Sequence, residues 1–133
     1  MKKHNRFSFV KEHGNLADIL TDHKLAALGD AYINFAYSLA LSERKGQPSG
    51  AKVKGNILAE AFRRAGLREY MPKRVTRHML ADAAEALMVY AWIKSCIEFE
   101  ECVKILCQVE DPIEGFSQLL IKIKERIMTA RTF

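Results

Sequence analysis

Hydrophobic residues recur along most of the chain at steps of three and four, the period of an α-helix that packs on one side. The first long run of this kind begins at residue 23 and lines up one apolar face, which consists of Leu25, Leu28, Tyr32, Phe35 and Leu39. Thr21 or Asp22 can cap the start of this helix, because both side chains accept a hydrogen bond from a free backbone N–H. Residues 46–50 hold two glycines and a proline, so we expect the helix to end in a loop there.

The helical period returns after this loop. It covers residues 51–66, about 79–95, 98–110 and a last run that starts at Pro112, and a short helix is also predicted at 15–20. The side chains predicted to face the core are Val53, Ile57, Leu58, Ala61 and Phe62, then Leu80, Ala83, Ala84, Leu87, Met88 and Ala91, and then Ile113, Phe116, Leu119, Leu120, Ile123 and Ile127. Strand signals are nearly absent, since no Asn-Gly or Asp-Gly turn lies between alternating runs. The sequence therefore predicts an all-α fold.

The composition is that of a globular protein. The chain has 133 residues, of which 49% are hydrophobic and 28% charged, and this is enough for one domain with a core. No apolar run reaches the length of a membrane span, and the first residues lack the apolar core of a secretory signal. Cys96, Cys102 and Cys107 lack C-x-x-C spacing and fall in an apolar helical stretch, which predicts reduced thiols in the core. We expect a soluble cytoplasmic protein in which residues 1–133 form a single domain.

The net charge of +5 is unevenly distributed. Residues 44–77 contain ten Lys or Arg and two Glu, a net charge of +8, whereas the rest of the chain has eleven basic and fourteen acidic residues. A local excess of this kind favours a polyanionic partner such as a nucleic acid. An ordinary solvated surface explains the same counts, and both interpretations remain open at this point.

Three acidic residues stand in apolar helical surroundings. Asp82 and Glu85 are three residues apart and share a helix face among alanines, and Asp30 lies in the first long helix. If the two helices pack together the carboxylates converge, and like charges raise one another's pKa unless a cation neutralises them. Oxygen ligands of this kind suit Mg²⁺ or Mn²⁺. The alternative is that each acid pairs with a nearby Arg or Lys, or points into solvent.

Gly29 directly precedes Asp30 and is a weak helix former. A glycine inside a helix costs ~1 kcal/mol relative to alanine. Because glycine has no side chain, it allows another backbone to approach closely. We therefore expect another backbone, or the neighbouring helix that carries Asp82 and Glu85, to approach Asp30 closely at Gly29.

Three stretches of the chain carry a family resemblance: LAALGDAYINF, KVKGNILAEAFRRAGL and LADAAEAL. They resemble, in this order, the signature E-x-x-E-F-L-G-D, the connecting helix and the second acidic motif D-x-x-E-A-L of the ribonuclease III catalytic domain. Order and spacing agree over residues 20–95, which makes the resemblance specific. It implies a helical bundle of the ribonuclease III endonuclease type, and residues 98–131 would add two C-terminal helices.

The resemblance also implies a function and a site. The family cleaves double-stranded or structured RNA in RNA processing, works as a homodimer and needs a divalent metal, so the implied cofactor is Mg²⁺ with Mn²⁺ as a substitute. Asp30 matches the aspartate of L-G-D, and Asp82 and Glu85 match the D-x-x-E pair; in the family all three are catalytic metal ligands. Attack by water would leave 5′-phosphate and 3′-hydroxyl ends.

Three positions depart from the family pattern. Ala26 stands where the second signature glutamate, usually a fourth metal ligand, is expected, and His23 stands in place of the first. Ala27 replaces the aromatic residue that usually reaches across the dimer interface. The compact Mini-III branch also has an alanine before its [FY]-x-G-D, so this alanine does not by itself indicate loss of activity.

The residues after the second acidic motif do not resemble the α-β-β-β-α module that binds double-stranded RNA. We therefore expect a catalytic domain that binds RNA with its own surface, through phosphates and 2′-hydroxyls rather than base edges. Such binding should weaken steeply with salt. The basic residues just before the connecting helix and just before the second acidic helix are the candidates for these contacts: Lys52, Lys54, Lys73, Arg74 and Arg77.

Two other functions remain open. The first is a catalytically weak or inactive protein of the ribonuclease III fold that binds RNA, which Ala26 favours and the three retained acids oppose. The second is a helical module for protein–protein interaction whose acids are simply solvated. This second alternative predicts neither RNA affinity nor an effect of metal on thermal stability.

Overall fold

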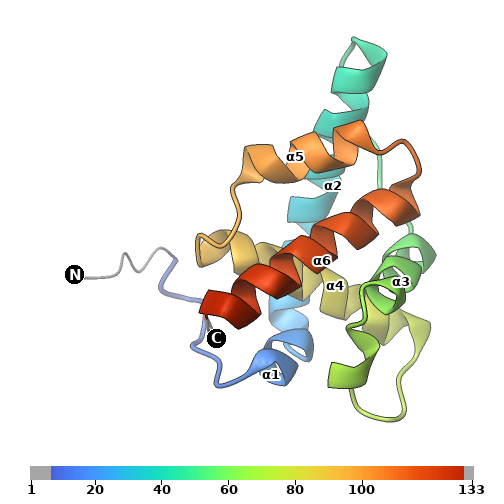
Figure 1. The fold of residues 1–133 in the computed structure, drawn as a ribbon. Helices are drawn as coiled ribbons and strands as arrows, with labels where there is room; N and C mark the ends of the chain where they lie inside the picture. Colours follow the sequence, from blue (N-terminus) through green and yellow to red (C-terminus); the bar gives the residue numbers. More distant parts are fainter. Residues whose placement is uncertain (1–6, 131–133) are drawn as a thin grey trace.

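The fold is built of α-helices. The computed structural model describes residues 7–130, and none of these residues lies in a strand, which confirms the all-α prediction (Figure 1). The ends of the predicted domain, residues 1–6 and 131–133, lie outside the described residues. No helix within 7–130 is long and apolar enough to cross a membrane. The elements are α1 (Leu16–Leu20), α2 (His23–Lys45), α3 (Gly55–Arg64), the 3₁₀-helix η1 (Arg68–Tyr70), α4 (Arg77–Ile93), α5 (Phe99–Gln108) and α6 (Pro112–Ala130).

Helix α4 lies at the centre of the bundle. It packs against α2 and α3 and also contacts α1 and α6, and α6 crosses it in Figure 1. All the residues predicted to face inward from α4 are buried, and so are those of α6 from Phe116 to Ile127, whereas Ile113 is half-buried. In α3 and the residue before its cap, Val53, Leu58, Ala61 and Phe62 are buried as predicted, whereas Ile57 is half-buried.

The predicted ends of α2 are confirmed, whereas α3 begins at Gly55 rather than at residue 51, and α4 covers Arg77–Ile93 rather than about 79–95. Residues 51–54 are not helical, because the N–H groups of Ala51 and Val53 bond side chains of α2. Asp22 caps α2, because its Oδ1 accepts a hydrogen bond from the N–H of Leu25 at 3.0 Å. Gly46, in the left-handed region with φ 75°, ends the helix. Pro112 is the first residue of α6, and Thr21 ends α1 rather than starting α2.

The prediction of which apolar residues of α2 face the core is wrong in part. Leu25 is buried and Tyr32 half-buried, but Leu28, Phe35 and Leu39 are 40%, 58% and 37% exposed. The buried side of α2 consists mostly of small residues, and its Gly29 lies directly against the backbone of Glu85, so α2 and α4 approach closely there. The buried residues of α2 are Leu25, Ala26, Gly29, Ile33, Ala36 and Ala40.

The cysteines are thiols, as predicted. Cys102 is buried, and its Sγ lies 3.3 Å from the hydroxyl oxygen of Tyr32. Cys96 and Cys107 are half-buried, so a core position is confirmed for Cys102 alone.

Candidate functional site

Acidic side chains from two helices line one pocket of about 340 Å³ between α2 and α4. Asp30 comes from α2, and Asp82 and Glu85 come from α4. We call this cavity the acid pocket. Its remaining lining residues are His23, Ala26, Ala27, Lys52, Val53, Gly55, His78 and Ala81. The three acids singled out in the sequence therefore share a single cavity.

A close approach of α2 and α4 brings these acids together. Gly29 lies against the backbone of Glu85, and a Cβ at residue 29 would overlap the carbonyl oxygen of Glu85. Only a residue without a side chain permits this contact, which confirms the expectation for Gly29. Asp30 follows the contact point directly, and Asp82 lies on the same face of α4 as Glu85. The spacing of the acids is thus set by helix packing.

Glu85 is the acid whose ionisation changes most. Burial raises its pKa, and contact with Asp30 and the charge of Asp82 raise it further, to about 8, although Lys52 acts in the opposite direction. In the absence of a cation, Glu85 therefore holds a proton at neutral pH. A bound cation would relieve this crowding of carboxylates, because it favours their charged forms.

Asp30 has a hydrogen bond on one side and a positive charge on the other. Its Oδ1 accepts a hydrogen bond from Nδ2 of Asn34 at 3.1 Å, and its Oδ2 lies 3.5 Å from Nζ of Lys52. The Lys52 side chain is 74% exposed, so water screens this ion pair. Asn34 was not predicted as a site residue, although its position one turn after Asp30 on the same helix is visible in the sequence.

Asp82 lies between two histidines. Its Oδ2 is 3.5 Å from Nε2 of His78, on the preceding turn of α4, and 3.8 Å from Nδ1 of His23, the first residue of α2. Both histidine side chains are exposed. His23 therefore reaches the acid pocket at the position where the family pattern has a glutamate.

Side chains of α2 that are spaced one turn apart form hydrogen bonds with the segment before α3. Ser38 Oγ accepts a hydrogen bond from the N–H of Ala51 and donates one to its carbonyl oxygen. Two similar contacts lie on either side of it, and we call the three together the loop clamp. Its pairs are Asn34 with Val53, Ser38 with Ala51 and Ser42 with Ser49, at 2.8, 2.9 and 2.8 Å from the backbone nitrogens. The clamp was not predicted; its only signal is the spacing of three small polar residues.

The donor chemistry of the acid pocket fits a divalent cation, because carboxylate oxygens are the ligands that Mg²⁺ and Mn²⁺ take. The side chains are not arranged as a complete ligand set: within residues 7–130, no group of three His, Cys, Asp or Glu is placed to hold one metal ion. Asp30 and Asp82 point instead to the nitrogen atoms of their own partners. Joint ligation therefore requires these carboxylates to rotate away from those partners.

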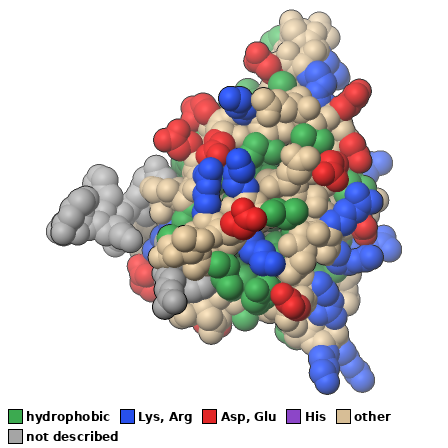
Figure 2. Space-filling model, in the orientation of Figure 1, with side chains coloured by type: hydrophobic (Ala, Val, Ile, Leu, Met, Phe, Trp, Pro, Cys, Tyr) green, Lys and Arg blue, Asp and Glu red, His purple; other side chains and the backbone are tan. Residues whose placement is uncertain are grey.

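The basic residues predicted to contact RNA fall in three places. Lys52 lines the acid pocket, Lys54 is the residue before α3, and the remaining three are exposed just before or at the start of α4. Arg68 holds this last segment, since its guanidinium donates hydrogen bonds to the carbonyl oxygens of Pro72 and Lys73. Figure 2 shows Lys and Arg side chains along the side of the molecule formed by α3 and the segment after it.

Large apolar side chains lie on the outer side of α2. The exposed residues Leu28, Phe35 and Leu39 follow one another along the helix, and the first two border a mostly apolar hollow of about 290 Å³. We call this surface the apolar face; it consists of Phe9, Leu28, Tyr32, Phe35, Leu39 and Trp92. It adjoins the acid pocket, because neighbouring α2 residues line the two cavities. Large apolar side chains exposed to solvent are typical of interaction sites.

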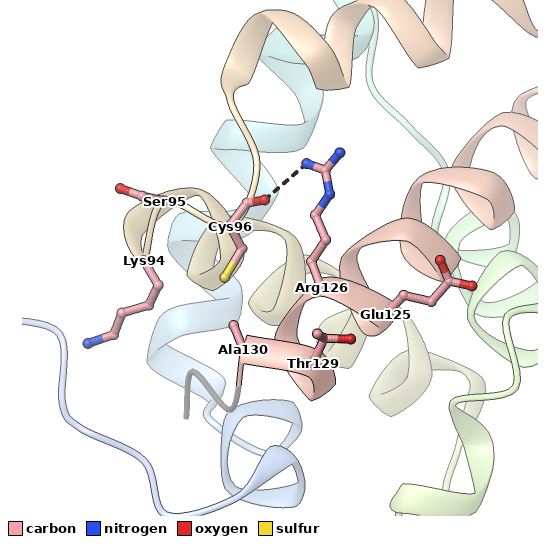
Figure 3. Close-up of a pocket in the computed structure, with 7 residues that line it drawn as sticks. All are labelled: Lys94, Ser95, Cys96, Glu125, Arg126, Thr129 and Ala130. Atoms are coloured by element: carbon pink, nitrogen blue, oxygen red, sulfur yellow. Dashed lines mark hydrogen bonds between the residues drawn. The ribbon is translucent and has the colours of Figure 1, made fainter.

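A larger cavity, of about 510 Å³, lies between the ends of α4 and α6 (Figure 3). Its Arg126 donates to the carbonyl oxygen of Cys96 at 3.0 Å and to both carboxylate oxygens of Glu101 at 2.9 and 2.6 Å. Its Lys94 lies 3.2 Å from Glu12. The basic groups of this cavity are thus engaged in holding segments of the fold together, and its size does not make it the functional site.

Comparison with models of known protein families gives a match. The family model described as Ribonuclease III matches residues 23–130. The match runs from the first residue of α2 to the last residue of α6 and so includes every residue of the acid pocket and of the loop clamp. None of the curated proteins matches the chain.

Proposed function

Because the chain belongs to the ribonuclease III family, we propose that it is a metal-dependent endoribonuclease that hydrolyses double-stranded or structured RNA in RNA processing. The observation that carries this proposal is the acid pocket, where Asp30 of α2 meets Asp82 and Glu85 of α4. Residues 1–133 would act as one catalytic domain. RNA as the substrate makes the cytoplasm the proposed compartment.

In this proposal, Asp30, Asp82 and Glu85 hold Mg²⁺, and Mn²⁺ can replace it. A cation held there supplies an activated water and stabilises charge on the leaving 3′ oxygen. Binding through all three carboxylates would release the proton of Glu85 to solvent and turn Asp30 away from Lys52, while Asn34 can still donate a hydrogen bond to Asp30. Water, rather than the 2′-hydroxyl of the RNA, would be the attacking group, so the products would carry 5′-phosphate and 3′-hydroxyl ends.

RNA would lie against the basic residues that flank the acid pocket. The proposed phosphate contacts are Lys52, Lys54, Lys73, Arg74 and Arg77. These side chains lie at the starts of α3 and α4, and α4 carries two of the acids. Recognition through phosphates predicts little dependence on base sequence and a steep loss of affinity with salt.

We further propose that the protein acts as a homodimer joined through the apolar face. Phe9 and Phe35, 71% and 58% exposed, supply aromatic surface that Ala27 does not. Because the apolar face adjoins the acid pocket on α2, two copies joined there would each bring an acid pocket to the edge of the interface.

A second candidate function is a ribonuclease III-fold protein that binds RNA but cleaves it weakly or not at all. The observation that favours it is Ala26, which lines the acid pocket and brings no carboxylate to it. Both candidates predict affinity for RNA duplexes. Only the first predicts cleavage that depends on a divalent cation.

The deciding experiment is incubation of the purified chain with a long RNA duplex and Mg²⁺ or Mn²⁺, followed by analysis of the product ends. Wild type should cleave, and Asp30→Asn and Glu85→Gln should each lower the rate by at least about 100-fold, the order of effect expected for losing a group that stabilises charge in the transition state. Glu60→Gln is the matched control, since Glu60 forms ion pairs with Arg63 and Arg64 in α3.

Each outcome separates the candidates. Cleavage that survives Asp30→Asn and Glu85→Gln would show that the assigned site is wrong. Duplex binding without cleavage under any cation would favour the binding protein. A melting temperature that rises with Mn²⁺ in wild type, but not in Asp82→Asn, would argue against a module that serves only protein–protein interaction.

A further inference from the structure

Lys52 differs from the other basic residues that we assign to RNA. Its ammonium lies 3.5 Å from Oδ2 of Asp30, at the edge of the acid pocket. Lys54, only two residues away, is equally part of the basic segment but makes no ion pair within residues 7–130. Two lysines of one short segment therefore have different surroundings, and one of them already has a carboxylate partner.

The position of Lys52 is fixed by the loop clamp. Four residues of a helix rise about 6 Å, and two residues of extended chain advance about 6.6 Å. Clamp residues four apart on α2 can therefore bind backbone groups two apart in the segment beside it. Lys52 lies between Ala51 and Val53, and both of these are bonded to α2. The backbone of Lys52 is held at both sides, and its side chain is directed to Asp30 by a fixed register.

Asn34 binds both this segment and Asp30. Its Oδ1 accepts the N–H of Val53 while its Nδ2 donates to Asp30. One side chain thus holds both the lysine-bearing segment and the carboxylate that the lysine contacts. This double contact distinguishes the Lys52–Asp30 pair from an accidental surface ion pair between two flexible side chains.

We propose that Lys52 is the built-in counter-ion of the acid pocket. It holds Asp30 while no divalent cation is bound, competes with the cation for that carboxylate, and turns to an RNA phosphate once Asp30 is taken. The inference rests on the proposed function, because it assigns Lys52 a role in the same site.

This role couples the binding of the divalent cation to the binding of RNA. A cation that takes Asp30 frees Lys52 for a phosphate, and a phosphate that holds Lys52 removes the competitor of the cation. Each ligand therefore strengthens the binding of the other by the same factor. The pair also reduces repulsion, because an approaching polyanion meets a neutral Lys52–Asp30 pair instead of a bare carboxylate.

The test is the Mn²⁺ affinity of the metal-free protein, measured from the electron paramagnetic resonance signal of free Mn²⁺. Lys52→Met should bind Mn²⁺ about two- to fivefold more tightly than wild type, which is the range expected for removing one exposed ion pair. Lys54→Met removes the same charge from the same segment and is the matched control. It should change the Kd by less than about 1.5-fold, since salt screens a charge that has no contact with the pocket. Equal affinities in wild type and Lys52→Met would overturn the inference.

A second readout is RNA affinity in EDTA, where Lys52 should be occupied by Asp30. Lys54→Met should weaken binding of a short RNA duplex by loss of a phosphate contact, whereas Lys52→Met should weaken it less, because it loses only the neutralisation of Asp30. An equal loss in both variants would mean that Lys52 is an ordinary phosphate contact and would overturn the inference. Both side chains are exposed, so the two variants are expected to keep the melting temperature of wild type.

Asp30→Asn separates failure of this inference from failure of the proposed function. If Asp30→Asn weakens Mn²⁺ binding and Lys52→Met does not strengthen it, the counter-ion role alone is wrong. If Asp30→Asn leaves Mn²⁺ binding unchanged, the assigned metal site is wrong and the counter-ion role fails with it. When both are right, the effect of Lys52→Met disappears in the Asp30→Asn background.

Discussion

Gly29 and Glu85 form the contact that determines both how α2 packs on α4 and how close the acids lie. The absence of a side chain at Gly29 permits the backbone of α4 to approach α2 closely, and the same approach places the side chain of Glu85 near Asp30. The close packing of α2 on α4 and the raised pKa of Glu85 therefore both follow from this contact. A substitution at Gly29 should change mainly the packing, and a substitution at Glu85 mainly the ionisation.

Gly29→Ala should destabilise the fold. Alanine gains ~1 kcal/mol of helix propensity, but its Cβ would overlap the carbonyl oxygen of Glu85, and overpacking typically costs about 1–3 kcal/mol or more. Because the overlapping atom belongs to the backbone, we expect the upper end of this range and a net loss of about 2 kcal/mol or more in the free energy of unfolding, measured by urea denaturation. Gly55→Ala is the control: its Cβ would lie 3.8 Å from that of Ala81, so it should be tolerated.

Glu85→Gln should stabilise the metal-free protein at high pH. The pKa of Glu85 is about 8 in the folded protein, so between its ordinary value and 8 the folded state holds a proton that the unfolded state has lost. The free energy of unfolding therefore falls as pH rises through this window. Because the side chain is partly solvated, we expect a gain of only about 1–2 kcal/mol at pH 8.5 and almost none at pH 4.

Denaturation of both proteins at the two pH values, in EDTA, measures this difference. Glu60→Gln controls for the loss of one negative charge on a helix surface. A gain of the same size at pH 4 and pH 8.5 would contradict a raised pKa at Glu85.

The sequence reveals the acids more readily than their partners. Asp30, Asp82 and Glu85 stand in motifs with fixed spacing, and Gly29 is conspicuous because it is a poor helix former. Their presence around one pocket could therefore be anticipated, while their role in metal binding remains a prediction. Asn34 and Ser38 carry no comparable signal, because a polar residue on a helix usually faces water. Only the position of the segment beside α2 shows what they bind.

At the scale of elements, α2 has three sides with different surroundings. Its small side packs on α4, its polar side holds the loop clamp and its large apolar side remains exposed. The sequence predicts the extent and the caps of this helix, because these depend on local residues. It does not predict that the side with Leu28, Phe35 and Leu39 is exposed, since that depends on how α2 packs against α4, which is distant in the sequence.

Arg44, at the end of α2, should matter for stability rather than for RNA. Its guanidinium donates hydrogen bonds to the carbonyl oxygens of Leu106, Cys107 and Val109, at the end of α5. Charge-assisted bonds to otherwise free helix carbonyls predict a loss of about 1–2 kcal/mol in Arg44→Met, measured by thermal or urea denaturation. Lys45→Met, at the neighbouring exposed position, should change stability by less than about 0.5 kcal/mol. Equal effects of the two substitutions would contradict this role.

At the scale of the whole molecule, the excess of positive charge in residues 44–77 has two uses. Some of these side chains stabilise the fold, as Arg44 does in α2 and Arg68 does after α3. Others, including Lys73 and Arg74, are exposed and available to a polyanion. A charge count along the sequence cannot separate these uses, because it contains no information on which carbonyls and carboxylates lie nearby.

The apolar face predicts self-association. Phe35 is 58% exposed and stacks on Phe99, so its removal should weaken a dimer without disturbing the core. Phe35→Ser should raise the dimer dissociation constant by about 10-fold or more, as expected for a central aromatic contact. Ile121→Ser, at an exposed apolar position on α6, is the control. Sedimentation equilibrium measures both, and a wild type that is monomeric at all concentrations would contradict the dimer.

The loop clamp also determines where the chain can change in length. A residue inserted between Gly46 and Ser49 would lengthen a surface turn before the first clamp contact, and the three bonded pairs could still form. A residue inserted between Ala51 and Val53 would move one partner out of step with the turns of α2 and swing the lysine away from Asp30. Insertions should therefore be tolerated between Gly46 and Ser49 and should disrupt the site between Ala51 and Val53, although the two places are only a few residues apart.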